Sequence, residues 1–443
     1  MNRKKFNRPP VKESFQYGNI VSWKFRDTIT PVRKAFAYRF TLIFSTGIEC
    51  PMQRGGYLTK TEALKAKEFT IAELHSKKFI PFAYTVKEFF DFWLYYYMVD
   101  VKDIAYNTFC SYHNIIYNYV LKTWDPDLKM KDIDRTDIKK VLDSIEAKGT
   151  LRLSYTVLRG AFSYAASHQI TKINPAIVAI RMKKKAEKKA YNQAIRNGTE
   201  TFKKKQYPIL SVPQISHLLL TCKNTYPDMY MPLLLSLTTG LRISEVIAIK
   251  FPDIDWWEGE LCVSRQLGRS LSNDGFDEER MCTQEIKTKS RSGNRNVPLA
   301  NFVIEELIVA RHKYETLQKS TPDFQDLDFV CFKENGTPYH RNSFKKAFKA
   351  LLVECNLPDM RWHDLRHTYA TVLKENEISL KAISVYLGHQ SISITEEVYI
   401  NPLEDPVYDC EKAISAFISD ILPQKEVIID IRSYQKDLLE FVS

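Results

Sequence analysis

The sequence predicts a multidomain protein in which a small α+β domain, an all-α bundle and a mainly α domain with a small β-sheet follow one another. One observation is length, because 443 residues exceed what a single ordinary core organises. Another is composition, since 44% of the residues are hydrophobic and 12% are aromatic, as in globular chains. A third is texture: strand-like runs occur near the start and again after residue 260, with helical patterns between them.

Two segments precede the predicted bundle. Residues 1–13 carry five basic residues and one acidic residue, and we expect a mobile basic arm there. Residues 14–78 hold the runs GNIVSWKFRD and FAYRFTLIFS, which predict two or three antiparallel strands, followed by turn signals in GIECPMQRGGY. Thr59 and Glu62 have the spacing of a capping box and predict a helix. Its inner face should be lined by Ala63, Ala66, Phe69, Thr70 and Leu74.

Basic residues alternate along the predicted strands of this small domain. They are Lys24, Arg26, Arg33, Lys34 and Arg39. A β-sheet can enter the major groove of DNA, so the basic face has two interpretations, a DNA-binding surface or a charged face in solvent.

Residues 79–182 are predicted to be helical throughout. Four segments follow one another, which is enough for a compact bundle. Thr85 is a candidate N-cap of the first helix, Asp134 or Thr136 caps the third, and Gly149 is expected to close the third. No individual binding site is assigned to these helices.

A basic linker is predicted over residues 183–206, part of it helical. Residues 181–205 hold ten basic and two acidic residues, a net charge of +8. A basic connector between two globular units suits a clamp around DNA.

The last domain is predicted over residues 207–423, with a mixed tail at 424–443. Ser211 and Pro213 open its first helix, a buried helix stops at Gly240, and LRISEVIAI begins the next. The runs ELCVSRQL, TQEIKTK and NRNVPLA predict three strands, and DFVCFKENGTPYH predicts another with an Asn-Gly turn. Further helices follow, the last in PVYDCEKAISAFISDIL.

Charge and cysteine usage narrow the class of protein. The net charge of +11 favours a polyanionic partner. The eight cysteines form no CxxC pair, which argues against a zinc site and against a secreted disulfide scaffold. The start, MNRKKFNRPP, lacks the apolar run of a signal peptide, and no apolar stretch is long enough to span a bilayer. We therefore expect a cytoplasmic protein without membrane contact.

Five residues form a coherent chemical set. They are Arg242 in TTGLRISEV, His363 and Arg366 in WHDLRHTYAT, and His389 and Tyr399 in LGHQSISITEEVY. Guanidinium groups can clamp a phosphate, imidazoles can donate or accept protons, and a tyrosine hydroxyl can attack. Tyr369 and Tyr386, in contrast, lie in apolar helical patterns and are expected in the core, and His367 is expected to pack or cap.

These motifs, in this order, resemble the active-site set of the tyrosine recombinases, the phage-type integrases. Tyr399 lies ten residues after His389, the spacing typical of the family's nucleophile. The resemblance is strong over 207–420. Residues 79–182 resemble the helical core-DNA-binding domain, and GGYLTKTEALKA within 14–78 resembles the arm-binding domain of integrases from phages and conjugative transposons.

The resemblance implies a mechanism. Arg242 and Arg366 would neutralise the scissile phosphate, with Glu245 supporting Arg242. Tyr399 would attack the phosphorus and form a 3′-phosphotyrosyl link, which preserves the bond energy for rejoining. His363 would assist deprotonation or hold the phosphate, and His389 would bond a non-bridging oxygen. No cofactor, metal or ATP is expected.

A hairpin lysine protonates the leaving 5′ oxygen in this family, and two candidates stand in EIKTKSRSGNRNVPL. The pattern favours Lys287 over Lys289, but the hairpin is longer by about two residues through Ser292 and Gly293, so both stay open.

The implied partners are double-stranded DNA at core and arm attachment sites, three further copies in a homotetramer on DNA, and an excisionase or host bending protein. The expected location is the prokaryotic nucleoid. Ile414, Phe417, Ile418 and Ile421 have helical spacing after Tyr399 and suit either docking on a neighbouring protomer or packing in cis. The leading function is site-specific integration and excision of a mobile element. A resolvase or topoisomerase-like enzyme and a catalytically silent DNA-binding protein are the alternatives.

Overall fold

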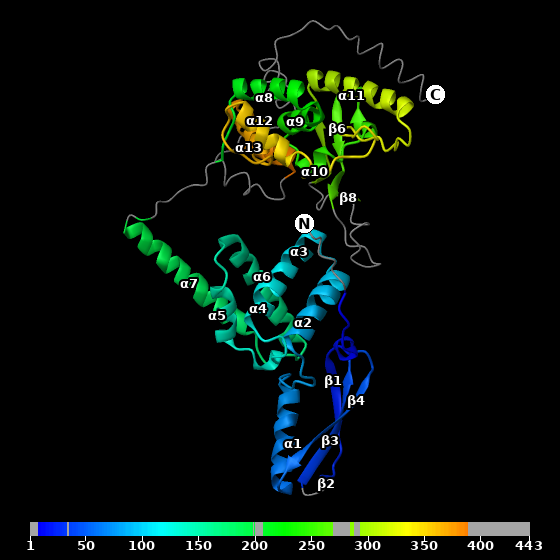
Figure 1. The fold of residues 1–443 in the computed structure, drawn as a ribbon. Coiled ribbons are helices and arrows are strands. Elements are labelled where there is room, and N and C mark those ends of the chain that lie inside the picture. The colour runs from blue at the N-terminus through cyan, green and yellow to red at the C-terminus, as the bar shows by residue number, and fades with distance from the viewer. Residues whose placement is uncertain are drawn as a thin grey trace. The chain divides into compact units, whose positions relative to one another are not determined.

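The chain is mainly helical with small β-sheets, as the sequence predicts. The computed structural model describes the following residues: 8–32, 35–197, 199, 207–268, 284–287 and 293–388. They form two compact units, one up to residue 199 and the other from residue 207 onward (Figure 1). The second unit has one hydrophobic core, and the first unit has two, one in its helical bundle and one under its sheet.

The first unit begins with a four-stranded antiparallel sheet. Its strands are β1 (Ile20–Phe25), β2 (Thr30–Val32), β3 (Ala35–Phe44) and β4 (Glu49–Tyr57). Because β4 pairs along most of β3, β1 and β2 share the other edge of β3. The expectation of turns in GIECPMQRGGY is wrong, since most of this run is β4. Gly55 allows the close pairing, because a Cβ there would come within 2.8 Å of the Ala37 side chain.

Helix α1 (Lys60–His75) packs on one face of this sheet (Figure 1). The predicted capping box is confirmed, because the Thr59 hydroxyl accepts from the Glu62 amide and the Glu62 carboxylate accepts from the Thr59 amide. Tyr38 on β3 reaches α1 and hydrogen-bonds to the Thr70 hydroxyl over 2.7 Å. Phe69 was wrongly placed on the inner face. It is 64% exposed, because Thr70 and Leu74 already fill the helix face toward the sheet.

Residues 8–16 lie against the helical bundle, whereas the sequence suggests a mobile arm up to residue 13. The Arg8 guanidinium donates to the carbonyl of Tyr95 over 2.8 Å and lies 4.5 Å from the centre of the Tyr96 ring. Phe15 stacks on Tyr84 and Phe92, with ring centroids 3.9 and 4.3 Å away. This segment, which we call the N-terminal strap (residues 8–16), therefore joins the bundle to the sheet that follows it.

Helices make up the rest of the first unit. They are α2 (Val86–Phe92), the π-helical η2 (Trp93–Val101), α3 (Tyr106–Ile115), the π-helical η3 (Ile116–Val120), α4 (Leu121–Thr123), α5 (Arg135–Asp143), α6 (Lys148–Ser167) and α7 (Pro175–Arg196). Thr85 caps α2 as predicted, and Asp134 caps α5. Gly149 does not close the third helix but lies in the first turn of α6, because α5 already ends at Asp143.

The basic run predicted as a linker is helical up to Arg196. Helix α7 buries its first turns, through Ala176, Ala179 and Ile180, against the bundle. Residues 184–193 are exposed on all sides. Lys183 ties the helix to α5 through an ion pair with Asp143 of 2.6 Å.

The second unit packs helices around two small sheets. Its elements are α8 (Val212–Thr225), α9 (Pro227–Thr239), α10 (Ile243–Val246), β5 (Ile254–Asp255), β6 (Glu260–Val263), β7 (Arg265–Gly268), β8 (Gln284–Lys287), β9 (Arg295–Pro298), α11 (Asn301–Ser320), α12 (Lys345–Glu354), α13 (Asp364–Glu375) and α14 (Leu380–Leu387). One sheet has the order β5-β6-β9 and the other pairs β7 with β8. Ser211 caps α8, and α9 stops at Gly240 with φ +63°, both as predicted.

Three elements of this unit differ from the prediction. The run ELCVSRQL is split between β6 and β7, which belong to different sheets. The run LRISEVIAI gives only the single turn α10, because the chain then turns into a bridge between Lys250 and Phe329. The run DFVCFKENGTPYH forms isolated bridges and no regular strand, although the expected turn is present, with Gly336 at φ +80°.

Several predicted features lie outside the described residues. They are Arg33, Lys34, Lys289, His389, Tyr399, the helix expected in PVYDCEKAISAFISDIL and the tail at 424–443. Among the helices that are described, none combines the length and the apolar character needed to cross a membrane.

Candidate active site

The site begins at the sharp junction between α9 and α10. Gly240 adopts the left-handed conformation and ends α9, and Arg242 then occupies the N-cap position of α10. The Glu245 carboxylate accepts from the Arg242 backbone amide over 3.1 Å and from its Nη1 over 2.8 Å. The side chain of Arg242 is 38% exposed while that of Glu245 is buried. The buried carboxylate therefore fixes the position of the Arg242 guanidinium, which stays accessible to solvent.

The start of α13 supplies the second part of the site. His363 is the N-cap residue of this helix and is exposed, and Arg366 lies one turn further on. Trp362 anchors the turn, because its indole N–H donates to the Ser236 hydroxyl on α9 over 2.9 Å. The packing of α13 on α9 thus brings the HxxR motif to the α9–α10 junction.

Arg366 joins the two motifs directly. It is 4% exposed, and its Nη1 donates to the Gly240 carbonyl over 2.9 Å. Its Nη2 donates to the carbonyl of Leu387, the last residue of α14. Burial and the nearby charge of Arg242 lower the pKa of Arg366, but a guanidinium stays charged in proteins. Two of its five N–H donors are used by these carbonyls, so the plane of the group is fixed.

A second buried arginine, Arg295 on β9, completes this network. Its Nη2 donates to Glu245 over 3.1 Å, its Nε to the Tyr386 carbonyl over 2.6 Å and its Nη1 to the Gly293 carbonyl over 3.0 Å. Burial disfavours the charge of Glu245, but Arg295 and Arg242 outweigh this and hold its pKa below the ordinary value. Sequence reasoning missed Arg295, although the R-x-V-P-L pattern after the hairpin was a signal for it.

The hairpin strands β7 and β8 place one of the two candidate lysines. The backbone of Lys287 pairs with Arg265 at the end of β8, while Lys289 lies outside the described residues. β7 packs against α10, so this end of the hairpin belongs to the same region as Arg242. The Arg265 guanidinium pairs with Asp253 over 2.6 Å, which ties the hairpin to the rest of the unit.

Other residues near the motifs are structural, as predicted. Tyr369 and Tyr386 are buried in the core of the second unit. His367 stacks on Tyr207, with ring centroids 4.0 Å apart. In the part of the chain that the structure describes, no group of three metal-ligating side chains comes together.

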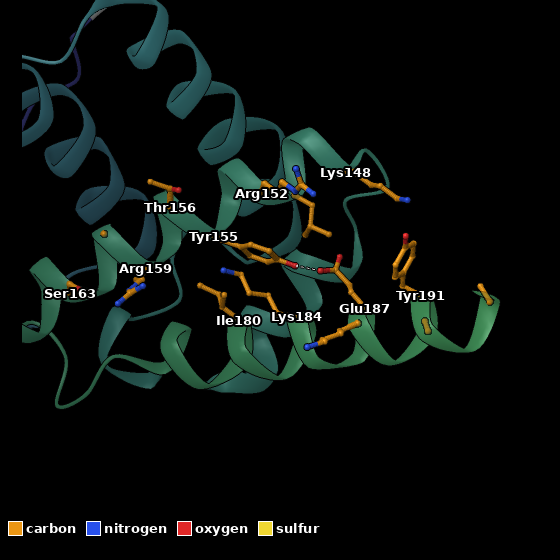
Figure 2. A pocket seen from close by; sticks show the side chains of 15 residues that line it. Lys148, Arg152, Tyr155, Thr156, Arg159, Ser163, Ile180, Lys184, Glu187 and Tyr191 are labelled. Carbon is orange, nitrogen blue, oxygen red and sulfur yellow. Dashed lines mark hydrogen bonds between the residues drawn. The ribbon is translucent and has the colours of Figure 1, made fainter. Parts of the chain in front are cut away.

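A basic cleft in the first unit is a feature that sequence reasoning did not assign. It lies between α6 and α7 and has a volume of about 1290 Å³ (Figure 2). Exposed residues at helical spacing on α6 form one wall: Lys148, Arg152, Thr156, Arg159 and Ser163. Lys184, Glu187 and Lys188 of α7 form the other wall, and Tyr155 at the base donates to Glu187 over 3.1 Å. The polar stripe along α6 was the signal in the sequence.

Comparison with known families agrees with this geometry. Residues 209–405, which contain Arg242, His363 and Arg366, match the Phage integrase family. The second unit therefore carries a domain of the tyrosine recombinase family. These enzymes catalyse DNA cleavage and rejoining.

Individual relatives extend the match beyond the second unit. The recombinase is 26% identical over 300 residues to a XerC-like tyrosine recombinase of Caldanaerobacter subterraneus, covering 66% of this chain and 73% of the relative. It is 27% identical over 208 residues to the transposase from transposon Tn916 of Enterococcus faecalis, covering 44% and 48%. Its fold is similar to that of a Tn1549 transposon integrase fragment solved with transposon right end DNA, with a TM-score of 0.54, 20% identity and coverage of 74% and 98%.

Gly240 should be indispensable for placing both arginines. A Cβ at this position would come within 2.3 Å of the Tyr369 ring and 2.8 Å of the Leu387 side chain. Because displacements of about 1 Å can cost about 100-fold in rate, we expect Gly240→Ala to slow DNA cleavage by about that factor. Gly259→Ala is the control, since Gly259 also has positive φ but a Cβ there would come no closer than 3.3 Å to its nearest neighbour, the Ile304 Cδ1. Equal rates in the two variants would contradict this role.

His363 should be neutral at pH 7 in the free recombinase. Partial desolvation of its ring, then the charge of Arg366, lower its pKa from 6.5 to about 4. Between these values the unfolded chain binds more protons at His363 than the folded chain, so its contribution to stability rises as pH increases from 4 to 6.5. Titration of the imidazole signals by NMR should give a midpoint near pH 4, and Arg242→Met should raise it. A midpoint near 6.5 in the native protein would show that desolvation and the neighbouring arginine charge do not lower the pKa of His363.

Proposed function

We propose that this chain is a site-specific DNA recombinase of the integrase type, which integrates and excises a mobile genetic element through a 3′-phosphotyrosyl intermediate. The observation that carries the proposal is the convergence of Arg242, His363 and Arg366 at the α9–α10 junction, although more than 120 residues separate the motifs. A site built of two guanidiniums and a neutral imidazole, within a chain of this family, suits a phosphodiester.

The two arginines are assigned different tasks. Arg366 is buried and held by two carbonyls, so it offers a fixed guanidinium edge to one phosphate oxygen. Arg242 is partly exposed and sits on Glu245, so it meets the phosphate from the solvent side. Together they offset the negative charge that otherwise repels a nucleophile, and each such donor is worth on the order of 100- to 1000-fold in rate.

His363 is assigned the acceptor of the nucleophile's proton. Its low pKa leaves a free nitrogen lone pair at neutral pH, which a general base needs. Once a phosphate neutralises the neighbouring guanidiniums, the same imidazole becomes more basic, so it gains proton affinity when the reaction requires it.

The remaining roles complete the reaction. Tyr399 attacks the phosphorus, His389 bonds a non-bridging oxygen and Lys287 protonates the departing 5′ oxygen. Support for Lys287 comes from its backbone position on β8, the strand paired with the β7 strand that packs on α10. No step in this scheme needs a metal or a cofactor.

DNA is the proposed partner of the first unit as well. The cleft between α6 and α7 presents five basic side chains and one acidic side chain: Lys148, Arg152, Arg159, Lys184, Lys188 and Glu187. We assign it to the backbone of the core site, because such a surface holds phosphates without reading bases. The uncovered face of the N-terminal sheet, which carries Lys24 and Arg39, is assigned to arm-type DNA.

Domain limits and assembly follow the same proposal. Residues 14–78 act as the arm-binding domain, 79–182 as the core-binding domain and 207–423 as the catalytic domain, with a basic linker at 183–206. Exchange of strands between two duplexes, with two protomers at each site, calls for a homotetramer. The segment after Tyr399 would connect its protomers, and an excisionase or host bending protein would set direction.

Covalent trapping tests the function. A nicked duplex carrying the end of the encoding element should form a protein–DNA adduct with the native chain and none with Tyr399→Phe. The adduct is measured on denaturing gels, and binding of the same duplex to the variant is the control. Absence of an adduct from the native chain on a duplex that it binds would exclude the enzyme and favour a silent DNA-binding protein.

The same substrate separates the two lysines. Lys287→Ala should slow cleavage by about 100-fold or more, because the leaving oxygen loses its proton donor, while DNA binding is retained. A 5′-phosphorothiolate at the scissile bond should restore the rate, since a thiolate leaves without protonation. Slow cleavage in Lys289→Ala together with a native rate in Lys287→Ala would reverse the assignment.

Salt dependence tests the cleft. Combined replacement of Arg152, Lys184 and Lys188 by alanine should weaken DNA binding and reduce the slope of log K against log salt by about 0.9 for each lost phosphate contact. Glu187→Gln should strengthen DNA binding, because it removes the acidic charge from the cleft and keeps a hydrogen-bond partner for Tyr155. Fluorescence anisotropy at several salt concentrations measures both, and an unchanged slope in the triple variant would remove the cleft from the interface.

A further inference from the structure

We propose that Arg295 is a positioning residue of the recombinase, which balances the buried charge of Glu245 so that the charge of Arg242 stays available to the scissile phosphate. This role rests on the proposed function. Arg295 would touch neither the phosphate nor the nucleophile and would act mainly through Glu245.

The geometry around Glu245 supports this division of labour. Its side chain is 5% exposed and lies between two guanidiniums. Oε1 accepts from Arg242 Nη1 over 2.8 Å, and Oε2 accepts from Arg295 Nη2 over 3.1 Å. The carboxylate thus has one oxygen for the side chain of each arginine, and the three groups carry a net charge of +1.

Exposure decides where this excess charge acts. The Arg295 side chain is 6% exposed, while the Arg242 side chain is 38% exposed. A buried charge is costly unless it is paired, so Glu245 draws its counter-charge from the buried arginine beside it. Without Arg295, Arg242 would be the remaining counter-charge of the carboxylate among these three groups, and its attraction to an incoming phosphate would fall.

The other contacts of Arg295 explain why it is an arginine. Its Nε and Nη1 donate to the carbonyls of Tyr386 and Gly293, so the guanidinium is held at three points. A lysine would keep the charge but could not reproduce a planar fork. We therefore expect charge to account for most of the functional effect and the carbonyl contacts for the rest.

The test is a double-mutant cycle between Arg295 and Glu245. Arg295→Met should lower the single-turnover cleavage rate at saturating nicked duplex by about 100-fold. The dissociation constant, measured in the Tyr399→Phe background, should change by less than about 3-fold, since much of the binding energy comes from contacts with the DNA backbone elsewhere. Arg295→Lys should recover most of the rate.

The decisive measurement is made in a variant whose buried carboxylate has been neutralised by Glu245→Gln. Within the Glu245→Gln background, Arg295→Met should slow cleavage by less than about 10-fold, because no buried carboxylate is left to compete for Arg242. Arg311→Met is the matched control: Arg311 also pairs with two carboxylates in this unit, those of Glu315 and Asp328, and its loss should leave cleavage unchanged.

Two results would overturn the inference. One is a native cleavage rate in Arg295→Met. The other is an equal loss from Arg295→Met in both backgrounds, which would mean that Arg295 acts through packing. If Arg295→Met alone does not fold, a loss of more than about 10-fold on going from Glu245→Gln to the double variant still refutes the inference. Failure of the native chain to form any adduct would instead refute the proposed function.

Discussion

The geometry of the site depends on one buried guanidinium. Arg366 lies inside the second unit and donates to two carbonyls, those of Gly240 and Leu387, that belong to separate helix ends. A buried charge of this kind is tolerated only with its hydrogen bonds satisfied, so the folding of α9, α13 and α14 around it is coupled. The same bonds orient the side chain that the proposed chemistry needs. The hydrogen bonds of Arg366 that stabilise this part of the fold therefore also position the site.

Much of the site could be predicted from the sequence, because its chemistry is carried by short motifs. Arg242, His363 and Arg366 are found together as the motifs suggest. The R-x-V-P-L pattern marks the position of Arg295, but its role could not be predicted, since that role depends on the meeting of β9, α10 and α14, which are distant in the chain. Local patterns indicate residue types with reactive groups, whereas a residue that acts by supporting another becomes visible only in tertiary contacts.

Prediction of the fold from the sequence meets a similar limit. Caps at Thr59, Thr85 and Ser211 and the stop at Gly240 were correct, because such signals act within one helical turn. Strand β4 was missed, because its glycines read as turns until β3 provides a partner along the whole run. The exposed Phe69 was misplaced since apolar spacing alone does not show how wide a helix face the sheet can cover. Long-range pairing, not local preference, decides these cases.

The N-terminal strap has a mechanical consequence. Phe15 is stacked between rings of the bundle, Arg8 is bonded to the carbonyl of Tyr95, and Lys172 of the bundle pairs with Glu73 of α1 over 2.6 Å. The sheet and the bundle are thus fastened at both ends of the small domain. Under the proposed function both parts hold DNA, and this fastening then sets the distance between the two DNA-binding surfaces. A duplex that reaches both surfaces of one such chain would have to bend or shift its helical phase to match that fixed distance.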